Sequence, residues 1–261
     1  MIDEFDLVAK IVVFDSGLGS LSIIKEIQKI VKTDIIYFAD QKNYPYGIKS
    51  QAQLTTIIKK TINLLEEKFM PDIIVVASNT PSLMMNLSTE RIIDVKPPLK
   101  LAQKKSKSKK IGILATKSAI NSKGLTNYIK ENNISKSYKI FKINGSNLVD
   151  LVESGKFLKN KKYCQKIIKK SLEQIITLEK IDTITLSSTH LLFLKPLLKK
   201  EFPQIQFIDP GSIVAKNIFL KIKNKQSKRN SLKIFTSGNV NDFKNKLDEM
   251  GIKNKIKFLS I

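Results

Sequence analysis

Two short polar segments carry many of the side chains in this sequence that could do chemistry. Ala77-Ser78-Asn79-Thr80 and Ser187-Ser188-Thr189-His190 each follow a run of strand-forming residues. Their hydroxyl and amide groups donate and accept hydrogen bonds. His190 is the only histidine in the chain and belongs to the one residue type that ordinarily changes charge near neutral pH. The two segments therefore indicate polar sites at strand ends, with proton transfer as a candidate reaction.

A serine hydrolase is one hypothesis for a serine near a histidine, and a purely structural hydrogen-bonding role for His190 is another. A hydrolase needs an orienting acid and a nucleophile on a strained turn, typically within Gly-x-Ser-x-Gly. The sequence has no such motif, and Ser188 is too close to His190 along the chain for the usual geometry. Hydrolysis is therefore the weaker of these hypotheses.

The hydrophobic pattern predicts that an α/β fold holds these segments, because short runs rich in Val and Ile alternate with longer amphipathic segments. Near-continuous apolar strands indicate doubly wound parallel sheets covered on both faces. The predicted strands are Ile11–Phe14, Ile35–Phe38, Ile73–Ala77, Ile111–Ala115, Lys139–Ile143, Thr183–Leu186, Gln206–Ile208, Leu232–Phe235 and Ile256–Leu259. The predicted helices are Leu21–Val31, Gln53–Lys68, Ser118–Asn132, Leu158–Leu178, Ile213–Ile222 and Asp242–Met250.

Two proline-containing breaks divide the chain into two predicted lobes. Lys96-Pro97-Pro98 and Asp209-Pro210-Gly211 interrupt both helix and sheet pairing. They predict a first α/β lobe over 1–97 plus 211–261 and a second over 98–210. The lysine-rich run Lys104–Lys110 follows the first break and predicts a solvated linker, because closely spaced like charges repel.

The composition predicts a cytoplasmic globular protein without a membrane segment. The 261 residues are 42% hydrophobic, enough for a real core, and no apolar stretch approaches the roughly 18 residues of a membrane span. A net charge of +23 would suit nucleic acid, but only Arg91 and Arg229 among the 46 basic residues are arginines. We therefore predict no specific nucleic-acid partner. Cys164, the only cysteine, lies in an amphipathic helical pattern and rules out an intrachain disulfide or multi-thiol metal site.

Further polar residues follow other predicted strands, at the edge where parallel sheets bind ligands. The loop Asp15–Ser20 leads into a helix whose first N–H groups suit an anion such as a carboxylate, although it matches neither a P-loop nor a dinucleotide motif. Pro45-Tyr46-Gly47 is a turn-forming run after Asp40. Thr116 follows another predicted strand, and Glu153 lies in a helical pattern.

Taken together, these segments resemble the glutamate racemase family over nearly the whole chain, through the order and spacing of their motifs. The motifs are Val13-Phe14-Asp15-Ser16-Gly17-x-Gly19, Tyr37-Phe38-x-Asp40, Pro45-Tyr46-Gly47, Asn79-Thr80, Gly112-x-x-Ala115-Thr116, Leu151-Val152-Glu153, Thr189-His190, Lys195-Pro196-Leu197 and Gly238. The resemblance implies two α/β lobes related by a pseudo-two-fold axis, with an acidic amino acid, glutamate or aspartate, in a cleft between them. It implies no cofactor and no metal, and a homodimer as the assembly common in the family.

The resemblance also implies roles for individual residues. In the family one cysteine removes the α-proton from one face of glutamate and a second delivers a proton to the other face, which interconverts L- and D-glutamate. These positions fall on Ser78 and Ser188, with Asp15, Glu153 and His190 as further catalytic residues. The implied substrate-binding residues are Asp15, Ser16, Pro45, Tyr46, Gly47, Asn79, Thr80, Thr116, Thr189 and His190.

Serine at both positions changes the expected chemistry. A cysteine with an unperturbed pKa of about 8.5 is partly ionised near neutral pH, whereas a serine hydroxyl needs a dedicated base. Each positioned acid or base contributes about 10²–10⁴-fold, so we expect weak or absent racemisation with hydrogen bonding retained. A non-catalytic sensor or partner-binding protein is the alternative. Other departures from the family pattern, at Ser20, Ser118-Ala119 and Leu191-Leu192, favour natural divergence over deliberate replacement of the cysteines.

Overall fold

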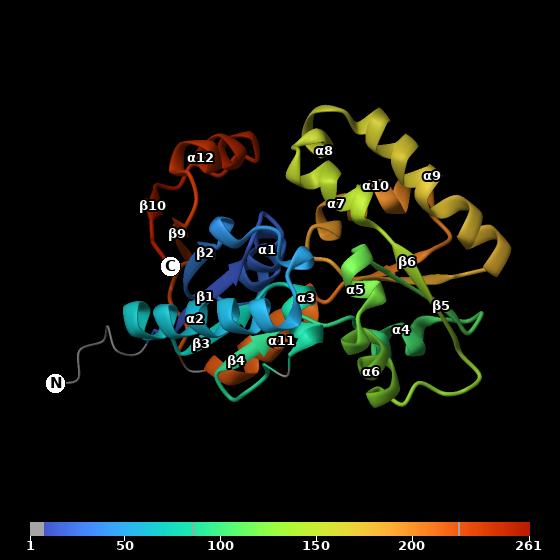
Figure 1. Ribbon diagram of the computed structural model, residues 1–261, viewed down its shortest axis with the longest axis horizontal. Coiled ribbons are helices and arrows are strands. Elements are labelled where there is room, and N and C mark those ends of the chain that lie inside the picture. Colours follow the sequence, from blue (N-terminus) through green and yellow to red (C-terminus); the bar gives the residue numbers. More distant parts are fainter. Residues whose placement is uncertain (1–7, 86, 224) are drawn as a thin grey trace. The chain divides into compact units, whose positions relative to one another are not determined.

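The computed structural model describes residues 8–85, 87–223 and 225–261. The chain divides into two compact units, Met1–Val95 with Gly211–Ile261, and Lys96–Pro210. Each unit has its own parallel sheet and its own hydrophobic core, and the α/β prediction is confirmed (Figure 1). Among the described residues, no helix has the length and apolar content that a membrane crossing requires.

The first unit is built on a six-stranded parallel sheet of order β10-β9-β2-β1-β3-β4. Its strands are β1 (Lys10–Asp15), β2 (Asp34–Ala39), β3 (Ile73–Val76), β4 (Ile92–Asp94), β9 (Ser231–Thr236) and β10 (Ile256–Phe258). Its helices are α1 (Ser20–Ile30), η2 (Gln41–Asn43), η3 (Tyr46–Ile48), α2 (Gln51–Phe69), α3 (Asn79–Met84), α11 (Gly211–Ile222) and α12 (Val240–Glu249).

Strand β1 shows why the central strands of this unit read as continuous apolar runs. Alternate residues of a strand point to opposite faces of the sheet. Val12 and Phe14 pack into a core cluster with Leu54 and Ile58 of α2, while α1 contacts β1 and β2 and packs against α11. Because helices cover both faces, every residue of Ile11–Phe14 is completely buried.

The second unit has a four-stranded parallel sheet of order β6-β5-β7-β8. Its strands are β5 (Lys110–Ala115), β6 (Lys139–Asn144), β7 (Thr183–Leu186) and β8 (Gln206–Ile208). Its helices are α4 (Leu99–Lys105), α5 (Lys117–Asn121), α6 (Lys123–Glu131), α7 (Ser146–Glu153), α8 (Lys156–Lys159), α9 (Lys161–Glu179) and α10 (Leu191–Glu201). The main core cluster joins the sheet to α7, α9 and α10.

The two sheets share one strand plan. The order β2-β1-β3-β4 in the first unit has the same chain sequence of strands as β6-β5-β7-β8 in the second. Strand β3 therefore corresponds to β7. Ser78 is the second residue after β3, and Ser188 is the second residue after β7. The two serines thus occupy equivalent places in their own units.

The structure corrects several predicted elements. The helix predicted over 118–132 is wrong as a single helix, because Ser122 ends α5 and its side chain accepts the Leu125 N–H (3.0 Å) at the start of α6. Helices α3, α4, α7 and α10 and strand β4 were not among the predicted elements. The short strand β4 has only three residues, and α10 contains Pro196, which argues against a helix on sequence grounds.

The lysine run after the first break is not a linker, contrary to the prediction. It forms the last turn of α4, a short loop and the first residue of β5. The carboxylate of Asp182 accepts hydrogen bonds from Ser106 Oγ (2.6 Å), Lys107 N–H (2.7 Å) and Ser108 N–H (2.6 Å). The Asp182 carboxylate therefore orders the loop, while the lysine side chains extend into solvent.

We expect Asp182→Ala to lower the free energy of unfolding by about 1–3 kcal/mol, because three donors lose one charged acceptor. Burial raises the pKa of Asp182, but the hydrogen bonds from Ser106 and Ser108 outweigh it and leave the pKa below its ordinary value of 3.8. The contribution is therefore full above that value and lost as pH falls through the lowered pKa. Urea unfolding at pH 7 and pH 3 tests this, with the exposed Asp150→Ala as the control. A similar loss in both variants contradicts the prediction.

Candidate functional site

The carboxyl ends of β1, β2 and β3 bring three polar residues to one edge of the first sheet. Asp15 is the last residue of β1, and its carbonyl accepts the N–H of Asp40 (2.8 Å), the residue after β2. On the other side of β1, Ala77 N–H donates to Phe14 O (2.9 Å) and extends the pairing to the residue before Ser78. Asp15, Asp40 and Ser78 therefore follow three adjacent strands.

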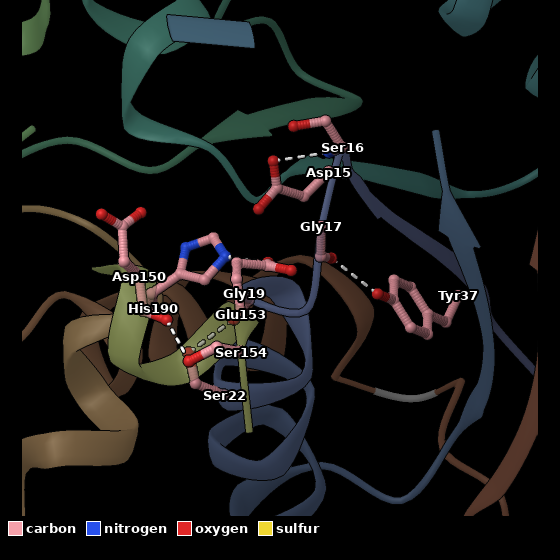
Figure 2. A network of polar contacts seen from close by, with 10 residues as sticks. All are labelled: Asp15, Ser16, Gly17, Gly19, Ser22, Tyr37, Asp150, Glu153, Ser154 and His190. Carbon is pink, nitrogen blue, oxygen red and sulfur yellow. Dashed lines mark hydrogen bonds and ion pairs between the residues drawn. The ribbon is translucent and has the colours of Figure 1, made fainter. Parts of the chain in front are cut away.

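The loop after β1 is fixed by its own hydrogen bonds. Figure 2 shows Asp15 Oδ1 accepting the N–H of Ser16 (2.6 Å) and Gly17 O accepting the hydroxyl of Tyr37 (2.8 Å). Ser22 Oγ donates to Gly19 O (2.7 Å) in the first turn of α1. Asp15 is 2% exposed, so its carboxylate is held in a defined place at the end of the strand.

Asp40 is the centre of a buried hydrogen-bond network that sequence analysis did not assign to the site. Its carboxylate is completely buried and accepts from Tyr46 Oη (2.8 Å), Asn43 Nδ2 (2.9 Å) and Ser237 Oγ (3.1 Å). Burial, then the negative charges of Asp40 and Asp15, raise the pKa of Tyr46 well above 10.0. Tyr46 therefore stays protonated, and its hydroxyl donates a hydrogen bond to the Asp40 carboxylate.

We expect the free energy of unfolding of Tyr46→Phe to fall less between pH 8 and pH 11 than that of the unmodified chain. An unfolded tyrosine ionises near its ordinary pKa of 10.0, whereas folded Tyr46 with its raised pKa does not. Its contribution to stability is therefore complete below pH 10 and is lost as pH rises beyond it. Urea unfolding at pH 8 and pH 11 should show the phenylalanine variant less stable at pH 8 and closer to the unmodified chain at pH 11. Tyr163→Phe, an exposed tyrosine, is the control. An unchanged difference between the two pH values contradicts the prediction.

The loop after β3 presents Ser78 with a free side chain. Ser78 lies at the N-cap of α3 and is partly buried, but its hydroxyl does not cap the helix and bonds to no described residue. The next residue, Asn79, is 5% exposed and donates through Nδ2 to Val95 O (2.8 Å). Its Oδ1 is buried and has no partner among the described residues. An oriented amide acceptor therefore lies directly beside the serine hydroxyl in the chain.

The equivalent loop of the second unit, after β7, holds Ser188. Ser187 N–H donates to Leu114 O (2.8 Å), and its hydroxyl bonds to Thr185 Oγ1 (2.9 Å), which fixes the strand end. Ser188 is 7% exposed, and its hydroxyl bonds to none of the residues that the structure describes. Thr189, 2% exposed, follows it. In both units the serine side chain is left unengaged while its neighbours are held.

His190 and Glu153 form a close pair in the second unit. His190 Nε2 lies 2.5 Å from Glu153 Oε1, and the two side chains are 10% and 13% exposed (Figure 2). Glu153 is the last residue of α7, and His190 immediately precedes α10. A carboxylate at this distance fixes the orientation of the imidazole ring. The pair can therefore hold a proton two residues from Ser188 in the chain.

In each unit, the helix after the serine also binds the residues at which the chain leaves that unit. In the first, Asn79 binds Val95 O, and Ser82 Oγ accepts the Val95 N–H (3.2 Å). In the second, Lys195 of α10 forms an ion pair with Asp209. The two helices thus make this contact with different groups, hydrogen bonds to backbone in the first unit and an ion pair in the second.

The side chains of two predicted binding residues make hydrogen bonds within the fold. Thr116 caps α5, because its Oγ1 accepts the N–H of Ala119 (3.3 Å). Tyr46, as described above, anchors to Asp40. Pro45 and Gly47 flank it and are partly exposed, whereas Thr80 is 8% exposed and Ser16 is 5% exposed. Ser20, at the start of α1, is completely buried with a hydroxyl that has no partner among the described residues.

The only thiol of the chain lies away from these strand ends. Cys164 belongs to α9 and packs in the core cluster of the second unit with no exposed surface. Burial raises the pKa of the Cys164 thiol, although the nearby Lys156 opposes the shift. Cys164 is therefore an un-ionised core residue, and the strand-end loops contain hydroxyls in place of thiols.

Solved structures of one class of protein have a similar fold. No family model matches the chain. The structure of glutamate racemase from Escherichia coli, with L-glutamate and the activator UDP-MurNAc-Ala, aligns with a TM-score of 0.81 at 22% identity over 97% of this chain and 98% of that one. The structure of glutamate racemase from Aquifex pyrophilus aligns with a TM-score of 0.70 at 28% identity over 95% and 98%. The fold is therefore that of the amino-acid racemases.

The sequence gives a narrower assignment. Glutamate racemase of Buchnera aphidicola subsp. Schizaphis graminum is 34% identical over 232 residues, which are 84% of this chain and 88% of the relative. The chain belongs to the glutamate racemase family.

Proposed function

We propose that this protein binds an acidic amino acid, glutamate first, and that its racemase activity is weak or absent. In this proposal Ser78 and Ser188 occupy the positions of the family's two acid–base cysteines. The observation that carries the proposal is the location of the only thiol, because Cys164 is fully buried within α9. Sulfur is therefore missing at both strand ends, while the surrounding hydrogen-bonding groups remain.

Ligand binding is supported by donors and acceptors that the fold has already positioned. Asn79 and Thr80 follow β3, Ser16 follows β1, and Thr189 follows β7, all at carboxyl ends of parallel strands. The Escherichia coli relative was crystallised with L-glutamate, and the Francisella tularensis relative with D-glutamate.

Racemisation would need one group to remove the α-proton and another to return a proton to the opposite face of the resulting carbanion. We assign these places to Ser78 in the first unit and Ser188 in the second. Asp15 would support the first, and Glu153 with His190 would support the second. A serine hydroxyl is not ionised at neutral pH, so proton removal is expected to be slow.

A non-catalytic sensor is the second candidate, and the same missing thiols favour it. A protein of this kind would keep the binding residues and lose the proton transfer. Several expectations from the sequence stay predictions. They are the pseudo-two-fold relation of the lobes, a ligand cleft between them, the lobe boundaries near residues 97 and 210, a homodimer, the absence of a specific nucleic-acid partner and a cytoplasmic location.

Titration calorimetry and solvent exchange test the proposal together. We expect saturable binding of glutamate or aspartate, measured with both enantiomers. Incubation with glutamate in D₂O, followed by proton NMR of the α-position, should show little or no deuterium incorporation. Slow, saturable incorporation would favour residual catalysis over the sensor. Failure to bind any acidic amino acid, or exchange at an ordinary enzymatic rate, contradicts the proposal.

A further inference from the structure

The carboxylate of Asp40 is buried and bound by hydrogen-bond donors from several parts of the first unit. It has no exposed surface, and three side chains donate to it, from Asn43, Tyr46 and Ser237. A charge is costly to bury unless hydrogen bonds compensate it. The donors therefore stabilise the buried carboxylate, and the carboxylate fixes the positions of the segments that carry the donors.

The three donors come from separate parts of the first unit. Asn43 belongs to η2 and Tyr46 to η3, so Asp40 binds both ends of the short segment that follows it. Ser237 follows β9, and its hydroxyl also accepts the N–H of Lys42 (3.1 Å). The backbone N–H of Asp40 donates to Asp15 O (2.8 Å). Asp40 thus ties the Pro45–Gly47 turn to the carboxyl ends of β1, β2 and β9.

The same contacts change the role of Tyr46. Its side chain is 2% exposed and its hydroxyl proton is donated to Asp40 at 2.8 Å. The phenol is therefore an internal anchor of the turn. Any contact of this turn with a ligand falls to the other groups of Pro45, Tyr46 and Gly47, whose positions depend on that anchor.

We propose that Asp40 is a positioning residue that, through Tyr46 and Asn43, holds the Pro45–Gly47 turn in the arrangement that binds the ligand. The proposal rests on the proposed function, because it assumes that this turn contacts an acidic amino acid. Asp40 itself touches no ligand in this scheme. Replacing its carboxylate by an amide removes one of two acceptor oxygens and presents an NH₂ group to donors, so the turn should loosen.

The first test compares binding by Asp40→Asn, Tyr46→Phe and the double variant. Asp72→Asn is the matched control, because Asp72 also accepts a backbone N–H, from Lys10 (2.9 Å), and a side-chain donor, from Lys225 (2.9 Å), but at the opposite edge of the same sheet. We expect the Kd for glutamate to rise about tenfold or more in both single variants, and the double variant to bind no more weakly than the weaker single variant. Asp72→Asn should stay within about twofold of the unmodified chain.

Stability is measured alongside, because a merely structural Asp40 would lower the Tm without changing the Kd of the folded protein. An unchanged Kd in folded Asp40→Asn and Tyr46→Phe overturns the proposal. If Asp40→Asn does not fold, Tyr46→Phe decides the question, since it removes a single hydroxyl and leaves Asp40 its other donors.

A second readout does not depend on ligand. The amide resonances of Gly47 in ligand-free protein, followed by ¹H–¹⁵N NMR, should shift or broaden in Asp40→Asn and Tyr46→Phe but not in Asp72→Asn. An unchanged Gly47 resonance overturns the proposal even where binding is altered. If the unmodified chain binds no acidic amino acid, the proposed function fails. In that case a shifted Gly47 resonance still supports the hold of Asp40 on the turn, and an unshifted one overturns it.

Discussion

The double variant Ser78→Cys/Ser188→Cys is expected to incorporate solvent deuterium into glutamate and to racemise it at least about 10²-fold faster than the unmodified chain. A positioned acid or base contributes about 10²–10⁴-fold, and racemisation uses one on each face of the substrate. A thiol with a pKa of about 8.5 supplies a usable thiolate near neutral pH, which a hydroxyl does not. The side chains of Ser78 and Ser188 bond to no described residue, so exchanging oxygen for sulfur breaks no hydrogen bond in the described structure.

The two single variants test proton transfer on each face of glutamate separately. Ser78→Cys alone and Ser188→Cys alone should each promote α-deuterium exchange from one enantiomer, with opposite preference, and should invert glutamate much more slowly than the double variant. Proton NMR in D₂O measures exchange, and circular dichroism or chiral chromatography measures inversion. The same preference in both single variants would contradict the assignment of the serines to opposite faces.

Cys164→Ala provides the control for the native thiol. Cys164 is buried in the core of the second unit, with a pKa raised by burial. Adding this substitution to the double variant should leave the gained activity unchanged apart from some loss of stability. A double variant that binds glutamate but exchanges no proton would show that further parts of the site have diverged, with Ser20 and Ala119 as the first positions to examine.

Central strands such as β1 and β3 could be predicted because burial on both faces leaves a continuous apolar run. The Ile11–Phe14 and Ile73–Val76 segments are apolar at every position, and the structure buries each one. Helix α10 was beyond this reasoning, because Pro196 is a helix breaker in isolation, whereas packing of Leu191, Leu194 and Leu198 into the core supports the helix. Tertiary burial there outweighs local propensity.

Part of the candidate site could likewise be predicted from the sequence, and part could not. The equivalent places of Ser78 and Ser188 could be predicted, since both follow apolar strands whose carboxyl ends bind ligands in parallel sheets. The network around Asp40 could not, because Ser237 is 197 residues away in the chain and no local pattern pairs the two. The strand-end position of Asp40 was a signal for a site residue, and Asn43 and Tyr46 lie close to it in the chain. The third donor, Ser237, reaches Asp40 only because β9 pairs with β2.

Loss of the Glu153 carboxylate is expected to impair proton transfer on the Ser188 side alone. In a Ser188→Cys background, Glu153→Gln should reduce α-deuterium exchange by about 10–10²-fold, less than the about 10²–10⁴-fold of a direct acid or base, because Glu153 acts through His190. Glu153 Oε1 lies 2.5 Å from His190 Nε2, and both side chains are nearly buried, so little solvent screens the pair. The carboxylate fixes the imidazole orientation through an acceptor oxygen, whereas an amide can present either an oxygen or an NH₂ group to the ring.

The Ser78→Cys background gives the matched comparison, because its thiol belongs to the other unit. Glu153→Gln should leave exchange there within about threefold, measured at the same glutamate saturation. His190→Asn should reproduce the Ser188-side loss, and the double variant Glu153→Gln/His190→Asn should add little, because the two residues act as one unit. Equal losses in both cysteine backgrounds would point instead to general damage to the second unit, since a pair that serves one proton-transfer group has no reason to slow the other.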